Sequence, residues 1–207
     1  MNQRRERYKS FILIGAPGSG KGTQGSILGA IPRFYHFSMG DAFRSMDTRT
    51  DIGQEFIKYS RKGDLVPDEL TIRFFQIQAD ARADLHMFKP DIDILILDGV
   101  PRNIEQARLL EDHIDVLQLF HLTCPDREEL ITRIRKRAIK SGRLDDANED
   151  VIRKRIETYE NETKGLIDFY HDRTSDINAD QPPVKVLSDI LKVVFDHPEW
   201  QEFVGEM

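Results

Sequence analysis

The sequence has a single cysteine, Cys124, so an intrachain disulfide and a multi-cysteine zinc site are both excluded. Low cysteine content is typical of a reducing compartment, and we expect Cys124 to be a small buried apolar residue. No apolar run approaches the ~20 residues that span a bilayer. Positive charge is in deficit, because 30 Lys and Arg face 36 Asp and Glu, so nucleic acid is not an expected partner. We therefore predict a cytoplasmic protein that binds neither membranes nor nucleic acid.

The 207 residues, 39% of them hydrophobic, suffice for one compact domain. Five short apolar runs, separated by longer segments with helical spacing, occupy residues 11–14, 34–37, 92–97, 116–122 and 176–179. Strands that alternate with helices predict an α/β fold, in which a parallel sheet carries helices on both faces. Residues 41–72, which are helical but strand-free, and the polar turn 140–146 interrupt this alternation as excursions from the same core.

A glycine-rich loop follows the first predicted strand directly and precedes a segment compatible with a helix. Its sequence is Gly15-Ala-Pro-Gly-Ser-Gly-Lys-Gly-Thr23. Glycines let successive backbone N–H groups turn inward and form an anion site at the positive end of the helix dipole. The lysine adds a full charge for the β and γ phosphates of a nucleotide. The predicted phosphate-binding residues are Gly15, Gly18, Ser19, Gly20, Lys21, Gly22 and Thr23. The alternative is a glycine-rich turn with a solvated lysine.

The loop departs from the general pattern G-x-x-x-x-G-K-[ST], because Gly22 follows the lysine and the hydroxyl comes one place later, at Thr23. In this form, GAPGSGKGTQ, it resembles the loop of adenylate kinases and related nucleoside monophosphate kinases. The resemblance extends over residues 11 to about 194 and rests on several separate motifs.

The resemblance implies one nucleoside monophosphate kinase domain over residues 1–207. It implies a five-stranded parallel P-loop sheet wrapped by helices, with a small helical monophosphate-binding segment at about 38–72. It also implies a short lid at about 138–148 and a monomer.

Three further segments are similar to the acceptor site of that family. Residues 37–44 (FSMGDAFR) look like the entry to the monophosphate site, where the arginine holds the acceptor phosphate. Residues 62–69 (KGDLVPDE) look like the segment whose backbone covers the acceptor base. Residues 97–102 (LDGVPR) would supply a second phosphate-binding arginine, and Gln106 would hydrogen-bond adenine. The implied AMP-binding residues are Met39, Gly40, Arg44, Asp64, Leu65, Val66, Gly99, Arg102, Gln106, Arg143 and Arg155.

Asp98 closes a run of branched apolar residues that we predict to be a strand. A carboxylate at the carboxyl edge of a parallel sheet can orient the water shell of a phosphate-bound Mg²⁺, so Asp98 is the predicted Mg²⁺ residue and acts through water. The alternative is that Asp98 caps the following helix. No residue is predicted to bind a metal directly, since the six histidines lack metal-ligand spacing.

Residues 127–143 carry seven Lys or Arg against two Glu, a basic cluster in an acidic protein. Such a cluster is usually a solvated helix face, but Arg133 and Arg137 are four residues apart and share one face. The cluster resembles the short lid, which implies that these two arginines contact ATP. The implied catalytic residues are Lys21, Arg137, Arg143 and Arg155. One extra residue before Arg155 departs from the usual short-lid spacing.

The resemblance implies reversible, Mg²⁺-dependent transfer of the terminal phosphoryl group of ATP to AMP, giving two ADP. This reaction requires two anions held in line, and it needs no general base because the acceptor phosphate is already ionised. A regulatory GTPase is disfavoured, since both D-x-x-G and N-K-x-D are missing. A UMP or CMP kinase remains an alternative, because Met39 stands where adenylate kinases commonly have threonine, although Gln106 favours AMP. A non-catalytic nucleotide-binding protein is a further alternative, which the presence of Lys21 and the arginines disfavours.

Overall fold

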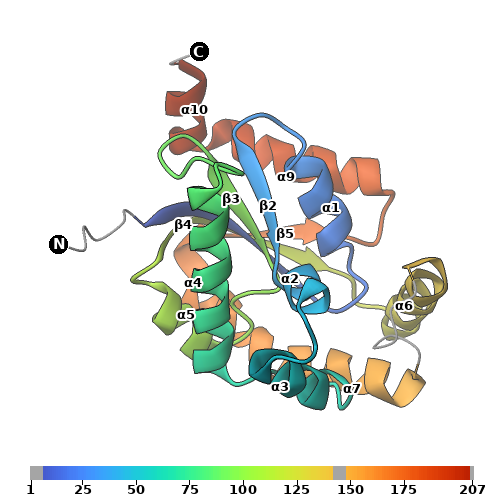
Figure 1. Ribbon diagram of the computed structural model, residues 1–207. Coiled ribbons are helices and arrows are strands. Elements are labelled where there is room, and N and C mark those ends of the chain that lie inside the picture. The colour runs from blue at the N-terminus through green and yellow to red at the C-terminus, as the bar shows by residue number, and fades with distance from the viewer. Residues whose placement is uncertain (1–6, 142–147, 206–207) are drawn as a thin grey trace.

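The computed structural model describes residues 7–141 and 148–205, and its central feature is a five-stranded sheet (Figure 1). The strands are β1 (Tyr8–Gly15), β2 (Phe34–Ser38), β3 (Ile94–Asp98), β4 (Ile114–Thr123) and β5 (Thr174–Asn178). Their order across the sheet is β2-β3-β1-β4-β5, and every neighbouring pair is parallel. The predicted α/β fold with a five-stranded parallel sheet is confirmed.

Helices connect the strands, as crossovers between parallel strands require. The helices of the described residues are α1 (Lys21–Leu28), α2 (Met39–Ser45), α3 (Asp51–Ser60), α4 (Asp68–Asp84), α5 (Ile104–Leu110), α6 (Arg127–Ser141), α7 (Glu149–Thr158), α8 (Gly165–Phe169), α9 (Pro183–Asp196) and α10 (Pro198–Gly205). A short π-helix, η2 (Tyr159–Thr163), continues α7, and a 3₁₀ turn, η3 (His171–Arg173), precedes β5. None of these helices combines the length and the apolar character that a bilayer crossing requires.

Each apolar run predicted to be a strand overlaps one in the structure. β3 begins at Ile94, two residues later than predicted, because the N–H groups of Ile92 and Asp93 turn back to the carbonyl oxygen of Lys89 at 3.0 and 2.8 Å. The late run 176–179 overlaps β5, which starts two residues earlier and pairs with the end of β4.

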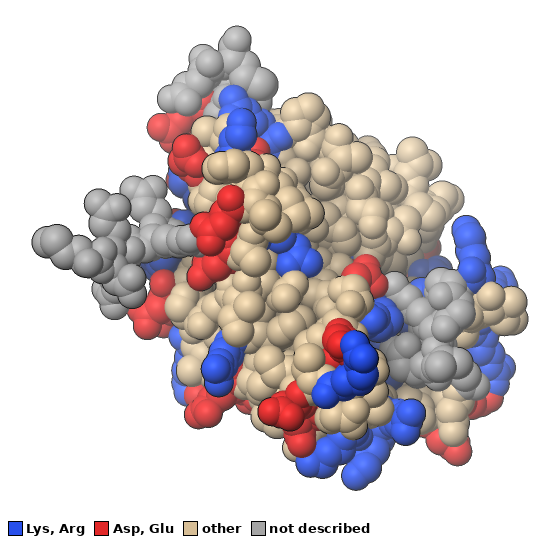
Figure 2. All heavy atoms as spheres, in the orientation of Figure 1, with Lys and Arg blue, Asp and Glu red and all other residues tan. Residues whose placement is uncertain are grey.

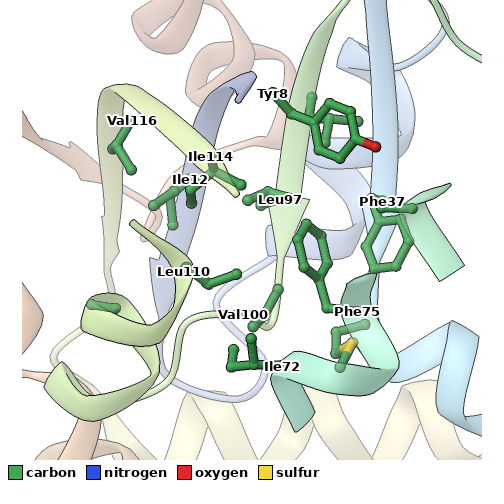
Figure 3. Packing of buried hydrophobic residues seen from close by; sticks show 14 of the residues in the cluster. Tyr8, Ile12, Phe37, Ile72, Phe75, Leu97, Val100, Leu110, Ile114 and Val116 are labelled. Carbon is green, nitrogen blue, oxygen red and sulfur yellow. The ribbon is translucent and has the colours of Figure 1, made fainter. Parts of the chain in front are cut away.

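Successive residues of β1 point to opposite faces of the sheet and enter two different apolar clusters. Ile12 and Ile14 belong to the cluster under α4, α5 and α8, which also contains Phe75 (Figure 3). Phe11 and Leu13 belong to the cluster under α1 and α9. Each such buried side chain contributes roughly 1.5–3 kcal/mol of apolar burial. Since both faces are covered, the central strands are continuous apolar runs rather than alternating ones.

A third cluster lies beyond the end of β1, where α6 packs against α7. Its buried side chains are Ala16, Leu130, Ile131, Ile134, Ile152 and Ile156. The side chain of Asn148 caps α7 by accepting a hydrogen bond from the backbone N–H of Asp150 at 2.8 Å. Cys124 packs at the margin of the second and third clusters and is only partly buried, so the prediction of a buried Cys124 is wrong. It follows the last residue of β4, where the chain leaves the sheet.

Residues 38–72 form α2, α3 and the first turn of α4, and contain no strand beyond the end of β2. The ring of Phe43 in α2 stacks on Phe56 of α3 and Phe74 of α4, with centroids 4.8 and 4.6 Å apart. These aromatic contacts attach the helical excursion to α4 and so to the core. Figure 1 shows α2, α3 and α7 grouped at the same end of the sheet.

Candidate active site

A cavity of about 720 Å³ opens at the carboxyl ends of β1 and β3, between the glycine-rich loop, α2, α6 and the last turn of α7. Ligands of open parallel sheets bind at this edge. The cavity is lined by every residue predicted to bind ATP: Gly15, Gly18, Ser19, Gly20, Lys21, Gly22, Thr23, Arg133 and Arg137.

The glycine-rich loop takes the backbone conformations that its sequence predicts. Gly18 and Gly20 have φ angles of 86° and 99°, which side chains rarely adopt. A Cβ on Gly18 would also lie 2.8 Å from the carbonyl oxygen of Leu130, so the residue must stay small for α6 to approach the loop. Gly20 precedes α1 directly, and the N–H groups at the start of that helix therefore face the cavity edge with a positive dipole.

Lys21 lies in the loop with its amino group folded back over the backbone. Nζ donates hydrogen bonds to the carbonyl oxygens of Gly15 at 2.7 Å and Ala16 at 3.0 Å. Burial lowers the pKa of Lys21 from 10.5 to about 8, Asp98 opposes this effect, and the arginines described below add to it. The lysine thus sits where positive charge is disfavoured until an anion arrives.

Three arginines lower the pKa of Lys21 further by repulsion: Arg102, Arg137 and Arg155. They come from the end of β3, from α6 and from α7, which are far apart in the sequence. All three line the 720 Å³ cavity. The structure therefore directs four cationic side chains from four elements at one volume, an arrangement suited to a polyanionic ligand.

A second cavity of about 60 Å³ lies between α2, the segment before α4, and α5. Its lining includes ten of the eleven residues predicted to bind AMP: Met39, Gly40, Arg44, Asp64, Leu65, Val66, Gly99, Arg102, Gln106 and Arg155. Several of them line both cavities, namely Gly40, Arg44, Leu65, Gly99, Arg102 and Arg155. The two cavities are thus adjacent and share their phosphate-binding candidates. The eleventh residue, Arg143, lies outside the described residues.

Two of these arginines are held by short contacts. The guanidinium of Arg44 donates to the carboxylate of Asp41 at 2.6 Å, and it lies so close to α2 that a Cβ on Gly40 would be 2.9 Å from it. Nε of Arg102 donates to the carbonyl oxygen of Gly99 at 3.0 Å. Both side chains are therefore oriented by neighbours in their own segment before any ligand binds.

Gln106 is almost fully buried and its carboxamide has a defined orientation. Oε1 accepts a hydrogen bond from the backbone N–H of Arg102 at 2.8 Å, and Nε2 donates to Oδ1 of Asp68 at 2.8 Å. Asn103 donates to the same Asp68 oxygen at 3.0 Å, and its own side-chain oxygen caps α5. A carboxamide can make four hydrogen bonds, so one donor and one acceptor site of Gln106 remain for a ligand.

Asp98 ends β3 and lines the large cavity, as predicted for a residue near a phosphate-bound cation. Its Oδ2 would lie 3.5 Å from a Cβ on Gly22, so the carboxylate lies against the phosphate loop. Nε2 of His36 is 3.8 Å from the same oxygen, beyond hydrogen-bond distance. The helix-capping alternative is wrong, because the side chain of Asn103, not Asp98, caps α5. Among the described residues, no three His, Cys, Asp or Glu side chains come together as a direct metal site.

The basic cluster lies largely on α6, where Figure 2 shows Lys and Arg side chains along the right edge of the molecule. Arg133 is not a free solvated side chain: it donates to Glu129 at 2.8 Å and to the carbonyl oxygen of Ala179 at 2.9 Å. Arg133 and Arg137 face the cavity together, as their four-residue spacing predicts. Of the predicted lid, residues 142–147 lie outside the described residues.

Several cavity residues escaped the sequence analysis. Lys136, Lys140, Tyr159, Thr163, Gln181 and Pro183 line the large cavity, and Asp68 supports Gln106 from beside the small one. The two lysines belong to the basic cluster, whose charge was a usable signal. Asp68 lies in the predicted base-covering segment 62–69, but no signal indicated its contact with Gln106. Tyr159 had no signal either, because only the fold brings its side chain near His121.

Comparisons with known proteins identify the family of the chain. The family model for adenylate kinase matches residues 13–175. An adenylate kinase of Leptospira biflexa is 39% identical over 171 residues, covering 78% of this chain and 86% of that protein. An adenylate kinase of Cyanothece sp. is 38% identical over 193 residues, covering 89% and 94%, and one of Mycolicibacterium smegmatis is 37% identical over 177 residues, covering 81% and 89%. The chain belongs to the adenylate kinase family.

Proposed function

We propose that the two adjacent cavities hold ATP and AMP at the same time, with the phosphates meeting between Lys21, Arg102, Arg137 and Arg155. As a member of the adenylate kinase family, the chain transfers the terminal phosphoryl group of ATP to AMP. The observation that carries the assignment of residues is the convergence of these four cations on one volume. Burial lowers the pKa of Lys21, and repulsion by the three arginines adds to the effect. The donor loop and the acceptor arginines thus serve one pair of anions.

The donor side consists of the glycine-rich loop and α6. The N–H groups of the loop and Lys21 hold the ATP phosphates, and Arg133 and Arg137 contact them from α6. The acceptor side consists of Arg44 and Arg102 for the AMP phosphate and of the small cavity for the base. Met39 and Val66 line that cavity with apolar surface, and the free donor and acceptor of Gln106 match the N6 amino group and a ring nitrogen of adenine.

Phosphoryl transfer requires in-line positioning and neutralisation of the charge on the transferring oxygens. The AMP phosphate is already an anion, so no side chain has to remove a proton. Arg137 of α6 and Arg155 of α7 both line the cavity. Together with Arg143 of the proposed lid, they neutralise the charge that spreads over the transferring phosphoryl group. Closure of the proposed lid over the two nucleotides excludes water, which would otherwise compete with AMP as the phosphoryl acceptor.

The residues at the end of β3 fit a Mg²⁺ ion bound with ATP. The Asp98 carboxylate faces the cavity beside the phosphate loop, and a carboxylate is a ligand type that Mg²⁺ accepts, either directly or through its water shell. Asp98 would hold the ion through water. Bound there, Mg²⁺ neutralises the donor phosphates. The contribution of the protein is to fix the carboxylate of Asp98 at the end of β3.

We also propose that the enzyme acts as a monomer in the cytoplasm.

A panel of acceptors tests the assignment of the base site. With ATP and Mg²⁺, kcat/KM should be highest for AMP among AMP, dAMP, CMP and UMP. Gln106→Leu should lower kcat/KM for AMP by roughly tenfold, because an unpaired buried polar group costs about 1–3 kcal/mol. KM for ATP should stay within about twofold, since Gln106 acts on the acceptor side. A higher kcat/KM for CMP or UMP than for AMP would overturn the role of Gln106.

A further inference from the structure

Outside the residues assigned above, three side chains form a continuous hydrogen-bonded chain that ends at the nucleotide cavity. His121 in β4 and Asp176 in β5 are paired in the sheet register and lie side by side. Nδ1 of His121 is 2.6 Å from Oδ1 of Asp176, and Nε2 is 2.8 Å from the hydroxyl oxygen of Tyr159. Tyr159 lines the large cavity, whereas Asp176 is exposed.

The direction of each hydrogen bond follows from the chemistry of the groups. An ionised carboxylate only accepts, so Nδ1 of His121 carries a proton and donates to Asp176. In the neutral imidazole, Nε2 is then an acceptor, and the Tyr159 hydroxyl donates to it. Burial and the charges of Asp176 and Glu160 raise the pKa of Tyr159 to about 12, so the hydroxyl keeps its proton. Asp176 therefore selects the imidazole tautomer that can hold Tyr159.

Tyr159 occupies a special place in the backbone. It directly follows α7 as its C-cap and is the first residue of the π-helix η2. Arg155 lies four residues earlier, so both side chains lie on the same face of α7, and both line the cavity. π-helical turns inside α-helices are frequent at functional sites.

The apolar contacts of α7 do not by themselves orient the side chains of Arg155 and Tyr159 toward the cavity. Ile152 and Ile156 pack against α6 in the third cluster and fix the distance of α7 from the core. Apolar burial is not directional, so it tolerates a small rotation of the helix about its axis. The hydrogen bond from Tyr159 to His121 is directional and ties the end of the helix to the sheet.

We propose that Tyr159 is a positioning residue for phosphoryl transfer, held by the His121–Asp176 pair so that Arg155 faces the transferring phosphate. This inference rests on the role proposed for Arg155. The sheet, the tyrosine and the arginine then form one rigid connection, and the guanidinium is already oriented when ATP and AMP arrive. Pre-organisation of this kind contributes to kcat more than to substrate binding.

The first test compares two tyrosine variants. Tyr159→Phe removes only the hydroxyl, and we expect kcat to fall roughly tenfold while KM for ATP and AMP changes less than about threefold. Tyr170→Phe is the matched control, because the pKa of Tyr170 is also raised by burial to about 12, yet Tyr170 does not line either cavity. The control should keep the parent kcat. An unchanged kcat in Tyr159→Phe would overturn the proposal.

The second test is a double-mutant cycle with Arg155→Ala. If Tyr159 acts through Arg155, Tyr159→Phe should lower kcat by less than about twofold in the Arg155→Ala background. A full repeat of the single-variant loss would mean that Tyr159 acts independently of Arg155, and would overturn the positioning role. If Arg155→Ala itself leaves kcat unchanged, the role proposed for Arg155 fails and this inference with it. If Arg155→Ala is impaired and Tyr159→Phe is not, only the positioning role fails.

A third measurement does not depend on activity. In ¹⁵N-histidine-labelled protein, at a pH where His121 is neutral, its NMR signals should show a proton on Nδ1 and a bare Nε2. Asp176→Ala should shift the population toward the other tautomer and lower kcat in proportion, and Asp176→Asn should restore both, since its amide oxygen still accepts from Nδ1. A proton on Nε2 in the parent protein would overturn the proposed chain.

Discussion

The amide nitrogen of Gln106 donates to the carboxylate of Asp68 at 2.8 Å, and this contact determines which edge of the carboxamide faces the acceptor cavity. A carboxylate cannot donate, so only Nε2 can occupy the position beside it. Oε1 is then directed to the N–H of Arg102. The adenine recognition proposed for Gln106 therefore involves a residue of α4 that does not line the small cavity.

Asp68→Asn should weaken the selection of AMP. An asparagine can both donate and accept, so it no longer enforces one orientation of Gln106. We expect kcat/KM for AMP to fall roughly fivefold to tenfold, the range of one hydrogen bond of about 1–1.4 kcal/mol, with KM for ATP unchanged. Steady-state kinetics with both substrates varied would measure this.

Glu69→Gln is the control for that variant. Glu69 lies beside Asp68 in the first turn of α4, so its neutralisation removes a comparable interaction with the helix dipole. Its side chain is exposed, and Gln106 should be unaffected. Equal losses of kcat/KM in the two variants would mean that helix charge, and not the orientation of Gln106, is responsible.

Met39→Thr should separate stability from selectivity. Met39 is only 1% exposed and belongs to the first apolar cluster, and it also lines the small cavity of about 60 Å³. The shorter threonine leaves unfilled volume, so the free energy of unfolding should fall by about 1–3 kcal/mol. The new hydroxyl can hydrogen-bond a base, so the ratio of kcat/KM for AMP over CMP should rise several-fold. Urea unfolding and the acceptor panel check the two effects, and an unchanged ratio would remove Met39 from base selection.

Much of the site could be predicted because it is local in sequence. The loop from Gly15 to Thr23 is one contiguous segment, and its glycines, its lysine and its place after a strand indicate an anion site without tertiary information. The strands were predictable for a similar reason, since burial on both faces produces unbroken apolar runs such as β3. Strand bounds differed where a turn competed, as at Ile92 and Asp93.

The supporting contacts could not be predicted in this way. The bonds between Gln106 and Asp68 and between Tyr159 and His121 each join residues 38 positions apart. Neither pair has a spacing that periodicity reveals, and each depends on where two elements meet in the fold. Sequence patterns thus indicate the residues that line the cavities, whereas the contacts that orient these residues emerge from the packing of α4 on α5 and of η2 on the sheet.

Arg143→Ala should act mainly on the chemical step. Arg143 lies outside the described residues, and the expectation comes from the lid position that the family resemblance implies for it. An arginine that faces charge redistributed in the transition state contributes a factor on the order of 10³ to kcat. KM should change much less. Arg135→Ala is the control, because exposed Arg135 pairs with Glu149 and does not line the cavity. A change confined to KM would make Arg143 a residue for ground-state binding.

Lys21→Met should abolish activity and yet leave the ligand-free protein at least as stable as the parent at pH 7. The lysine is proposed to hold the donor phosphates, but the fold disfavours its charge, as the lowering of its pKa to about 8 indicates. Methionine keeps the aliphatic chain and removes the buried ammonium. We expect kcat to fall by a factor on the order of 10³ or more, as when a transition-state cation is lost. Lower stability of the variant at pH 7 would show that the bonds to Gly15 and Ala16 outweigh the burial of charge.

The difference in stability between the parent and Lys21→Met should depend on pH, and the titration of Lys21 determines the sign of this dependence. Its pKa is about 8 in the folded chain and 10.5 in the unfolded chain, so between these values the unfolded state binds more protons. Stability attributable to Lys21 therefore rises with pH across this window and is constant below it. As the pH rises from 8 to 10, the free energy of unfolding of the parent should increase relative to that of Lys21→Met. Urea unfolding of both ligand-free proteins would measure this difference. Titrations common to both proteins cancel in the difference. If the difference in the free energy of unfolding does not change with pH, or changes in favour of the variant, the loop does not lower the pKa of Lys21.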